Sequence, residues 1–493
     1  MLLLSPIVVV PSLLILVGAI VLQRLRSPLA SVPGPWYALF TSLPLKWHEF
    51  NANRTRHIQA LHMRYGPAVR IAPGEVAFSS AAAVKEIYCS GGSGYDKTEF
   101  YNLFTVYGRR TMFSTLNKED HARRKRVLAD RYANSNIMKP ESLGGIEERS
   151  GRLLALARRS AAAGGGGSLD LYISLHSYAF DCASHHLFHP FGADSLQSCE
   201  DESIMREVTF DSSLQNRLVR YYSPAAHSAM GSVLRLFGAT PRETPLADKF
   251  VLDNSVRGHD ARSFTLLSRL SDKAWDLESL SIAAECLDHM AAGIDTTGDA
   301  LCFLMWELSQ PRSLRFQERL REELKGLGAA EGWDKLPYLD AVVMEGLRCF
   351  PAIPMSLPRY VPKGGRMIDG YLVPERTIVS CQAHSVHRVD EVFPAPDVFN
   401  PERWLVREGD AERRRSFFAF ANGGRGCVGK HLALAEMKIL LRDVYSAFST
   451  VPDESMSTAE MEMDDQLISS RPAGQRCLLR FIPDGSGKEP WNT

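Results

Sequence analysis

One cysteine in a glycine-rich loop is the side chain of this sequence best suited to carry chemistry. The loop runs from Phe420 to Gly429 and reads FANGGRGCVG, and an apolar, helix-patterned segment follows it at 431–448. Cys427 therefore lies at the start of a helix, where free N–H groups favour the thiolate over the thiol. Arg425 adds a positive charge two residues away, and Gly429 lets the loop lie flat against a planar ligand. A lone thiolate of this kind suits a soft metal ion.

Two other roles are open to Cys427. It could be a buried structural cysteine, which is the usual fate of an intracellular thiol. It could also be a nucleophile on a strand–turn–helix elbow, but that elbow needs glycine two residues before the nucleophile, where this chain has Arg425. The complete pattern Phe-x-x-Gly-x-Arg-x-Cys-x-Gly favours thiolate ligation of haem iron over both.

The same pattern is the haem-ligand signature of the cytochrome P450 family, and the chain resembles that family. The resemblance implies a mainly α fold with small β-sheets, in which haem b (iron protoporphyrin IX) lies between a long bent helix and the helix of the cysteine loop. Cys427 would be the axial ligand of the haem iron, and Phe420, Arg425 and Gly429 would contact the haem. The motifs occur in the family's order over residues 33–483, which is nearly the whole chain.

A second chemical candidate lies within a long helical pattern at 276–310. The segment 291–298 reads AAGIDTTG, and its small residues, threonines and glycines are poor formers of a helix interior. Threonine can bond back to a carbonyl one turn earlier and bend the helix. The segment resembles the family's Ala/Gly-Gly-x-Asp/Glu-Thr element, which implies that Thr296 supports a hydrogen-bonded water and that Asp295 relays protons from solvent. Close helix packing through small residues is the alternative.

Three further residues are candidates for binding the haem propionates. The segment 117–132 reads as a helix with a basic cluster, for which a solvated face is the alternative explanation. By resemblance, His121 and Lys125 occupy the positions of a tryptophan and an arginine that bind a propionate in the family. A histidine donor and a lysine cation can also hold a carboxylate, without the bidentate geometry of arginine. Arg359 lies where the family has a second propionate-binding arginine.

Glu345 and Arg348 would form an ordinary i,i+3 ion pair if they stood alone. They are followed by Pro351 and later by the segment 399–404, which reads FNPERW. This order resembles the family's Glu-x-x-Arg motif with its downstream arginine. The resemblance implies a buried network of Glu345, Arg348 and Arg403 that holds the cysteine loop, and such a network is costly to break once it is fully paired.

Composition narrows the possible partners. Lys plus Arg and Asp plus Glu both number 57, so the net charge is zero and nothing favours a nucleic acid. The nine cysteines show no CxxC pair and no zinc-ligand spacing, which fits a reducing compartment. A length of 493 residues alone suggests about three domains, whereas the resemblance implies a single catalytic domain over residues 37–493.

The N-terminus is predicted to anchor the chain in a membrane. Residues 1–23 carry no charged side chain and are mostly apolar, which is long enough for a transmembrane helix. Arg24 and Arg26 follow, and no basic segment precedes the apolar run, so the positive-inside rule places the catalytic domain on the cytoplasmic side. Residues 24–36 then form a basic, proline-rich hinge. A cleaved signal peptide, with residues 29–31 as a weak cleavage candidate, is the alternative.

The expected activity is that of a haem-thiolate monooxygenase, which inserts one oxygen atom of O2 into a lipophilic small molecule. The resemblance implies NADPH–cytochrome P450 reductase as the electron donor, cytochrome b5 as a further partner, and a single-pass location in the endoplasmic reticulum membrane. Segments 65–73 and 97–101 resemble fungal members of the family, which favours a substrate from secondary metabolism. The segment 91–116 is expected to cover the distal pocket, with a mobile surface loop as the alternative.

Two other classes of function stay open. One is a thiolate-haem isomerase or dehydratase that does not use O2. Thr296 and Asp295 speak against it, because such an enzyme needs no proton relay. The other is a non-catalytic haem protein in the membrane, against which the long loops argue, since they provide for substrate entry. Residues 200–260, where the family has two substrate-covering helices, show no readable pattern.

Overall fold

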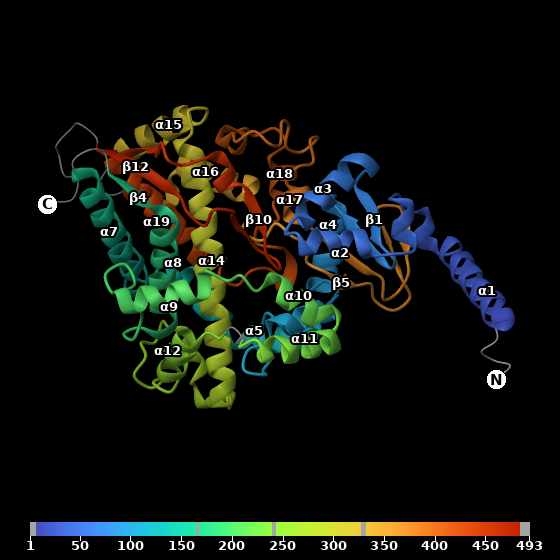
Figure 1. The fold of residues 1–493 in the computed structure, drawn as a ribbon. Coiled ribbons are helices and arrows are strands. Elements are labelled where there is room, and N and C mark those ends of the chain that lie inside the picture. The colour runs from blue at the N-terminus through green and yellow to red at the C-terminus, as the bar shows by residue number, and fades with distance from the viewer. Residues whose placement is uncertain (1–5, 164–166, 239–242, 327–331, 484–493) are drawn as a thin grey trace.

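A long helix, α14 (Ser279–Ser309), crosses the centre of the molecule, and other helices pack along it (Figure 1). The computed structural model describes residues 6–163, 167–238, 243–326 and 332–483. The predicted fold class is confirmed, because helices form most of the described chain and the strands form only small sheets. The helix expected at 276–310 corresponds to α14, which is continuous from end to end.

The helices predicted around the site are present, and the region without a readable pattern, 200–260, contains α9 to α12. Besides α14, the helices are α1 (Pro6–Leu25), α2 (Leu43–Phe50), α3 (Arg54–Tyr65), α4 (Ala81–Cys89), α5 (Lys118–Leu128), α6 (Asn134–Ile137), α7 (Pro140–Ala162), α8 (Leu171–Phe188), α9 (Cys199–Thr209), α10 (Leu214–Tyr222), α11 (Pro224–Leu236), α12 (Pro245–Ser255), α13 (Leu266–Leu270), α15 (Leu314–Lys325), α16 (Pro337–Cys349), α17 (Ala383–Val386), α18 (Asp410–Ser416) and α19 (Lys430–Ala447).

The largest sheet has the strand order β1-β2-β8-β5-β3, and three smaller sheets accompany it. In the largest sheet β2 and β8 run parallel, and the other neighbours are antiparallel. Its last pairing places Lys97 directly opposite Arg359. The strands are β1 (Ala68–Ala72), β2 (Glu75–Phe78), β3 (Asp96–Lys97), β4 (Ser168–Asp170), β5 (Arg359–Tyr360), β6 (Arg366–Ile368), β7 (Tyr371–Val373), β8 (Ile378–Cys381), β9 (Phe448–Pro452), β10 (Met463–Asp465), β11 (Ser470–Pro472) and β12 (Leu478–Pro483).

Glycines in the middle of α14 allow α8 to pack closely against it. A Cβ atom at Gly293 would lie 2.9 Å from the Ala183 side chain, and one at Gly298 would lie 2.7 Å from the ring of His176. Protein interiors are too densely packed to relieve such contacts without a shift of the helices. The packing alternative for the segment 291–298 therefore accounts for its two glycines.

The largest apolar core lies where α7, α8, α14, α16 and α19 meet. Buried side chains of α19, such as Leu440 and Leu441, pack into it. Burial of apolar area is the main favourable term that holds helices together. The core therefore fixes the N-terminal end of α19, and the cysteine loop before it, relative to α14.

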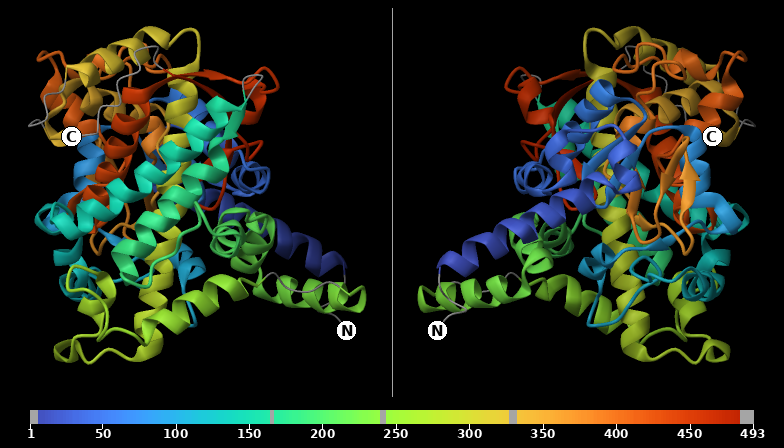
Figure 2. Two further views of the ribbon diagram at one scale, coloured as in Figure 1. Left: turned by 90° about the vertical axis from the view of Figure 1, so that its left-hand side faces the viewer. Right: turned by 90° about the vertical axis from the view of Figure 1, so that its right-hand side faces the viewer.

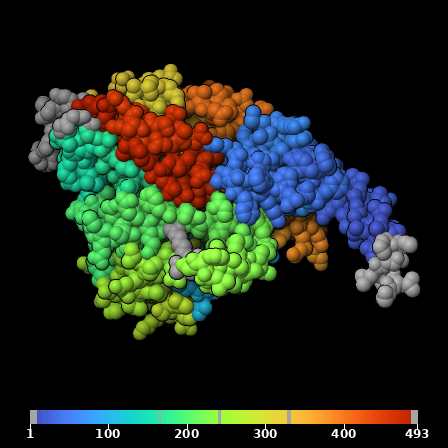
Figure 3. Space-filling model, viewed as in Figure 1, coloured from blue at the N-terminus to red at the C-terminus, as the bar shows by residue number. Residues whose placement is uncertain are grey.

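Helix α1 extends away from the body of the molecule, as the space-filling view shows (Figure 3). The predicted anchor covers residues 1–23, of which residues 1–5 lie outside the described part, and α1 continues to Leu25. Within the described ranges, no helix is both long and apolar enough to cross a membrane. The predicted transmembrane, single-pass helix is therefore not supported.

The segment predicted as a hinge, residues 24–36, is held against the body by Arg70 of β1. Its guanidinium donates to the carbonyl oxygens of Leu29, Val32 and Pro35 at 2.8, 2.7 and 3.3 Å. Leu29 and Val32 are themselves buried. Buried backbone carbonyls need such partners, so Arg70 fixes the point at which the chain leaves the body toward α1.

Candidate functional site

A cavity of about 440 Å³ lies between the middle of α14 and the cysteine loop. Much of its wall is apolar or aromatic, with contributions from Phe104, Met112, Phe113, Leu214, Ile353 and Ile468. Most of the predicted site residues line this same space, namely His121, Asp295, Thr296, Arg359, Phe420, Arg425, Cys427 and Gly429. An apolar cavity with a few converging polar groups is the usual form of a binding site for a small molecule or cofactor.

The cysteine loop turns sharply before α19. Gly423 has a φ of +72°, and a Cβ there would lie 2.0 Å from the carbonyl oxygen of Tyr88. Only glycine fits this position, for reasons of both backbone conformation and space. The backbone N–H of Cys427 donates to the carbonyl of Phe420 at 2.8 Å, which closes the loop and leaves the sulfur directed at the cavity.

The side chain of Cys427 is exposed to the cavity but lies inside the protein. Burial raises the pKa of its thiol, while the N–H of Gly429 and the ammonium of Lys125 partly oppose that effect. The start of the helix therefore does not by itself make Cys427 a thiolate. A metal cation at the sulfur would do so, because a coordinating thiol is deprotonated.

Positive charge is concentrated on one side of the cavity. Lys97 and Arg359 are buried and face each other across the β3–β5 pairing, and Arg425 is buried near them. Like charges directly opposite on paired strands are destabilising. Burial, and then Arg359 and Arg425, hold the pKa of Lys97 well below its usual range. An anion at this place would offset the repulsion, as Asp288 does in part for Lys97.

Arg425 is incompletely paired. Its Nη2 is 3.3 Å from a carboxylate oxygen of Asp96, but its Nε and Nη1 have no hydrogen-bond partner in the part of the chain that the structure describes. Burial, and then Arg359, lower the pKa of Arg425 to about 10. Buried donors without an acceptor are costly, so the site has the character of a receptor for carboxylate or phosphate oxygens.

His121 and Lys125, the two site residues predicted on α5, have different surroundings. His121 is buried and lines the cavity, and burial, followed by Lys97 and Arg425, lowers its pKa to about 3. It is therefore neutral and can donate one N–H. Lys125 is outside the lining of the cavity, and its Nζ donates to the carbonyl of Gly424 at 2.9 Å. This contact supports the cysteine loop, and binding of a propionate by Lys125 stays a prediction.

These residues fit haem. The backbone of Gly429 is unstrained and a Cβ there would meet only the Cys427 sulfur, at 3.9 Å, so protein packing does not require glycine. Space left free beside the sulfur is what a flat ligand needs. The cations of Lys97, Arg359 and Arg425 match a ligand that carries carboxylates, because charge-assisted hydrogen bonds satisfy such donors best.

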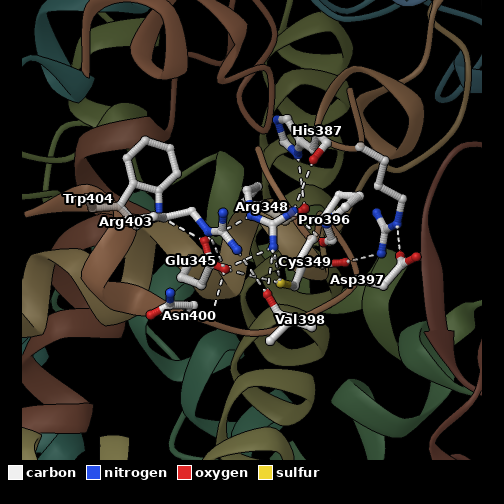
Figure 4. Close-up of polar contacts among 12 residues, drawn as sticks. Glu345, Arg348, Cys349, His387, Pro396, Asp397, Val398, Asn400, Arg403 and Trp404 are labelled. Carbon is white, nitrogen blue, oxygen red and sulfur yellow. Dashed lines mark hydrogen bonds and ion pairs between the residues drawn. The ribbon is translucent and has the colours of Figure 1, made fainter. Parts of the chain in front are cut away.

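Outside the lining of the cavity, Glu345, Arg348 and Arg403 form one polar network (Figure 4). The carboxylate of Glu345 accepts from Arg348 at 2.8 and 2.9 Å, from Arg403 at 3.0 Å, and from the indole N–H of Trp404 at 2.9 Å. The backbone N–H of Asn400 is a further donor at 2.9 Å. Burial would raise the pKa of Glu345, but Arg348 and Arg403 hold it below its usual range.

His387 connects this network to the cysteine loop. Its Nε2 accepts from the backbone N–H of Phe418 at 2.7 Å, so its Nδ1 carries the hydrogen and donates to the carbonyl of Arg348 at 3.1 Å. Burial, followed by Arg348, lowers the pKa of His387 to about 3. The neutral ring therefore acts as a fixed link, with one donor and one acceptor in use.

Asp295 and Thr296 face the cavity from α14. The Thr296 hydroxyl donates to the carbonyl of Ala292 at 2.7 Å, which leaves its oxygen free to accept from water. Asp295 accepts from the hydroxyl of Thr209 at 3.1 Å. Burial, and then repulsion by Asp299, raise the pKa of Asp295 to about 7. A carboxyl with this pKa can both hold and release a proton near neutral pH.

Several residues of the site were missed by the sequence-based prediction, and Lys97, His387 and Glu436 are among them. Lys97 was noted only as part of the segment 97–101, and its pairing with Arg359 depends on a strand contact that no local pattern announces. His387 has its partners far away along the chain. Glu436, a lone carboxyl on the buried face of α19, accepts from Thr297 at 3.2 Å, and burial raises its pKa to about 8. An acid within an apolar helix face was a usable signal for Glu436.

Comparison with known proteins finds a matching family and relatives over most of the chain. The family model described as Cytochrome P450 matches residues 33–478. The chain is 29% identical over 494 residues to cytochrome P450 monooxygenase tazI of Aspergillus terreus, covering 96% of this chain and 97% of the relative. It is 29% identical to cytochrome P450 monooxygenase stcB of Emericella nidulans, with 94% and 91% covered, and 28% identical to cytochrome P450 monooxygenase aflV of Aspergillus parasiticus, with 92% of each covered.

Replacing Glu345 with Gln is expected to lower the free energy of unfolding by about 3–5 kcal/mol, because the buried guanidinium of Arg348 and the half-buried one of Arg403 lose their counter-charge. The depressed pKa of Glu345 means that its contribution is present above the ordinary carboxyl pKa and is lost as the pH falls through the folded value. Urea unfolding measures both effects. Glu402→Gln removes an exposed partner of Arg319 and should cost at most about 1 kcal/mol. Equal costs for the two variants would contradict a supporting role of the network.

Replacing Lys97 with Met is expected to weaken haem binding about ten- to hundredfold, which corresponds to about 1.5–3 kcal/mol for a charged hydrogen bond. Haem dimethyl ester, which lacks the carboxylates, should bind equally to the variant and the unmodified protein. Haem titration followed by absorbance gives both dissociation constants. Lys85→Met, which changes an exposed lysine of α4, is the control. A similar loss for the ester would show that Lys97 acts through packing and not through its charge.

Proposed function

This chain belongs to the cytochrome P450 family and is a monooxygenase of that family; from this membership we propose that it inserts one oxygen atom of O2 into a lipophilic small molecule of secondary metabolism. The electrons come from NADPH through NADPH–cytochrome P450 reductase, with cytochrome b5 as a further donor. The observation that supports the proposal is a single cavity lined by Cys427 of the cysteine loop and by Asp295 and Thr296 of α14.

Each side of the cavity has its own task. Bound haem supplies a thiolate-ligated, redox-active iron able to activate dioxygen. Cys427 is the ligand, and Phe420 and Gly429 shape the surface beside it. Lys97, Arg359 and Arg425 hold the acidic edge of the cofactor, with His121 as a neutral donor. All but Lys97 of these residues were predicted from the sequence, and their roles at the haem are part of the proposal.

On the opposite wall, Asp295 and Thr296 deliver protons. The Thr296 oxygen accepts a hydrogen bond from a water in the cavity, because its own hydrogen is directed to Ala292. Asp295, with its pKa raised to about 7, releases a proton to that water and recovers one from solvent. An isomerase or dehydratase has no use for such a pair, so its presence favours the monooxygenase over the reaction without O2.

The substrate is held by apolar contacts. Phe104, Met112 and Phe113 from the segment 91–116 line the cavity, and the ring centroids of Phe104 and Phe113 lie 5.2 Å apart. Leu214 of α10 and Ile468, after β10, face the same space. Apolar area of this extent favours a lipophilic ligand. A secondary metabolite is supported by the resemblance of segments 65–73 and 97–101 to fungal members of the family.

Contact with the endoplasmic reticulum membrane is also part of the proposal. Most large apolar side chains of α1 from Val9 to Leu25 are exposed, and α11 and the residue after it expose Val233, Leu236 and Phe237. The two helices extend from the same side of the body (Figure 2). Exposed apolar patches of this kind mark surfaces that contact lipid or protein.

Vesicles of phosphatidylcholine and phosphatidylserine test this contact. The full chain should sediment with them, and removal of residues 1–30 should lower the bound fraction about tenfold or more, because most of the exposed apolar area is lost. The absorbance of the bound haem should not change. A full chain that stays in the supernatant would remove lipid contact from the proposal.

Replacing Thr296 with Ala is expected to separate electron use from product formation. Without the hydroxyl the water is not held, so NADPH consumption should continue while product per NADPH falls about ten- to hundredfold, since one hydrogen bond at this step is worth about 1–3 kcal/mol. The reduced O2 that does not form product should be recovered as hydrogen peroxide. Thr296→Ser keeps a hydroxyl and should restore product. Product, peroxide and NADPH are measured together in the presence of the reductase, and full coupling in the Ala variant would reject this role for Thr296.

A further inference from the structure

A second carboxyl, Asp299, lies one turn after Asp295 on α14 and lines the same cavity. Its side chain is 5% exposed, and its Oδ1 lies 3.4 Å from Nε2 of His176 on α8, whose side chain is fully buried. Side chains four residues apart on a helix have Cβ atoms about 5–6 Å apart. The carboxyls of Asp295 and Asp299 are therefore within reach of one bridging water.

The proton positions on His176 follow from its other contact. Nδ1 lies 2.6 Å from the carbonyl oxygen of Tyr172, and a carbonyl can only accept, so Nδ1 carries a hydrogen in either charge state. Nε2 is then the nitrogen that gains or loses a proton. It is also the nitrogen that faces Asp299, so one proton can lie on either partner of this pair.

The position of the imidazole depends on Gly298. A Cβ at this residue would lie 2.7 Å from the His176 ring, and glycine in a helix interior costs about 1 kcal/mol relative to alanine. A buried ion pair is itself weak evidence for stability, since apolar residues of the same volume often serve the fold as well. The close packing of α8 on α14 that Gly298 permits thus places His176 beside Asp299, and stability alone does not explain why an ionisable pair lies there.

The groups that face the pair come from three elements. Tyr172 of α8 is buried and its hydroxyl has no hydrogen-bond partner among the residues described. Arg471 of β11 lines the cavity and donates to the carbonyl of Asp211 at 2.8 Å. Asp295 and Cys302 are the neighbours on α14. Burial raises the pKa of Asp299 against the opposing effects of His176 and Arg471.

The pair also acts on Asp295 directly. Repulsion by Asp299 is the second cause, after burial, that raises the pKa of Asp295, and His176 opposes it. For His176, burial lowers the pKa, but Asp299 and Asp295 raise it above its usual value overall. The pKa values of Asp299 and His176 are thus both raised, and the charge of Asp295 acts on His176 in turn.

We propose that Asp299 and His176 are a positioning pair that holds one proton and passes it to Asp295 after Asp295 has released its own. The inference rests on the proposed function, because only a reaction that consumes protons in the cavity needs the second stage. The proton leaves Asp299 or His176 Nε2, crosses to the Asp295 carboxylate, and is replaced from solvent. The Arg471 cation offsets the negative charge left on the pair in the meantime.

The first test asks whether the pair holds a proton in the haem-loaded protein without substrate. Infrared spectra are compared on raising the pH across neutrality. The unmodified protein should lose one carboxyl or imidazolium signal that Asp299→Asn and His176→Gln both lack. This measurement needs no turnover, so it stands even if reductase and O2 yield no product and the proposed function fails. Identical spectra for all three proteins would overturn the proposal.

The second test asks whether that proton is used. Asp299→Asn should lower product formation about tenfold, and the solvent deuterium isotope effect on product formation should rise above that of the unmodified protein. His176→Gln serves as the second variant if Asp299→Asn binds haem poorly. Glu307→Gln is the matched control, because Glu307 is a buried carboxyl of α14 that pairs with Arg312 away from the cavity. It should keep both the rate and the isotope effect.

A structural role would give a different result. Asp299→Asn and Glu307→Gln would then lower the unfolding midpoint alike and leave the isotope effect unchanged. An infrared signal that disappears in Asp299→Asn while product formation stays at the unmodified rate would also overturn the proposal, since the proton would be held but not delivered.

Discussion

The buried carboxylate of Glu345 is the interaction on which the position of the cysteine loop depends. Two guanidinium groups, an indole and a backbone N–H meet at its two oxygens. An ion pair without solvent is favourable only when every donor and acceptor is satisfied, and here the remaining donors of Arg348 are taken up by carbonyls between His387 and Val398. His387 then links this network to the cysteine loop, because its ring accepts a hydrogen bond from the backbone N–H of Phe418. The sulfur is thus placed by a network whose charged members, Glu345, Arg348 and Arg403, lie outside the lining of the cavity.

The charged side chains around Glu345 and those that line the cavity therefore differ in how they are paired. In the network around Glu345, the charges of Glu345, Arg348 and Arg403 are paired with one another. Inside the cavity, Lys97, Arg359 and Arg425 form a cluster of cations, and burial and mutual repulsion act against them. The fold accepts this cost because apolar packing of α8, α14 and α19 holds the walls of the cavity in place. The paired network around Glu345 supports the cysteine loop. The cluster of Lys97, Arg359 and Arg425 is suited to binding an anion.

The sequence predicted those parts of the site that depend on local pattern. The cysteine loop, α14 and α16 have motifs whose residue types and spacing are visible along the chain, and they are the elements on which the site is built. The residues that the sequence-based prediction missed have contact partners that are distant in the sequence. Lys97 meets Arg359 through strand pairing, and His387 bridges two segments that share no pattern. Helices α9 to α12 were unreadable because their apolar faces follow from the elements they cover. Lys125 has the expected spacing but bonds to a carbonyl of the loop, since spacing on a helix does not determine where a long side chain ends.

The pairing of β3 with β5 has a consequence for the life of the newly made chain. Before the cofactor arrives, the edge of the sheet contains two facing cations, so the empty form is less stable there than the loaded form, by the ordinary linkage of ligand binding to folding. A ligand with carboxylates bound at this edge therefore stabilises the folded chain, and the folded fraction rises with the concentration of that ligand.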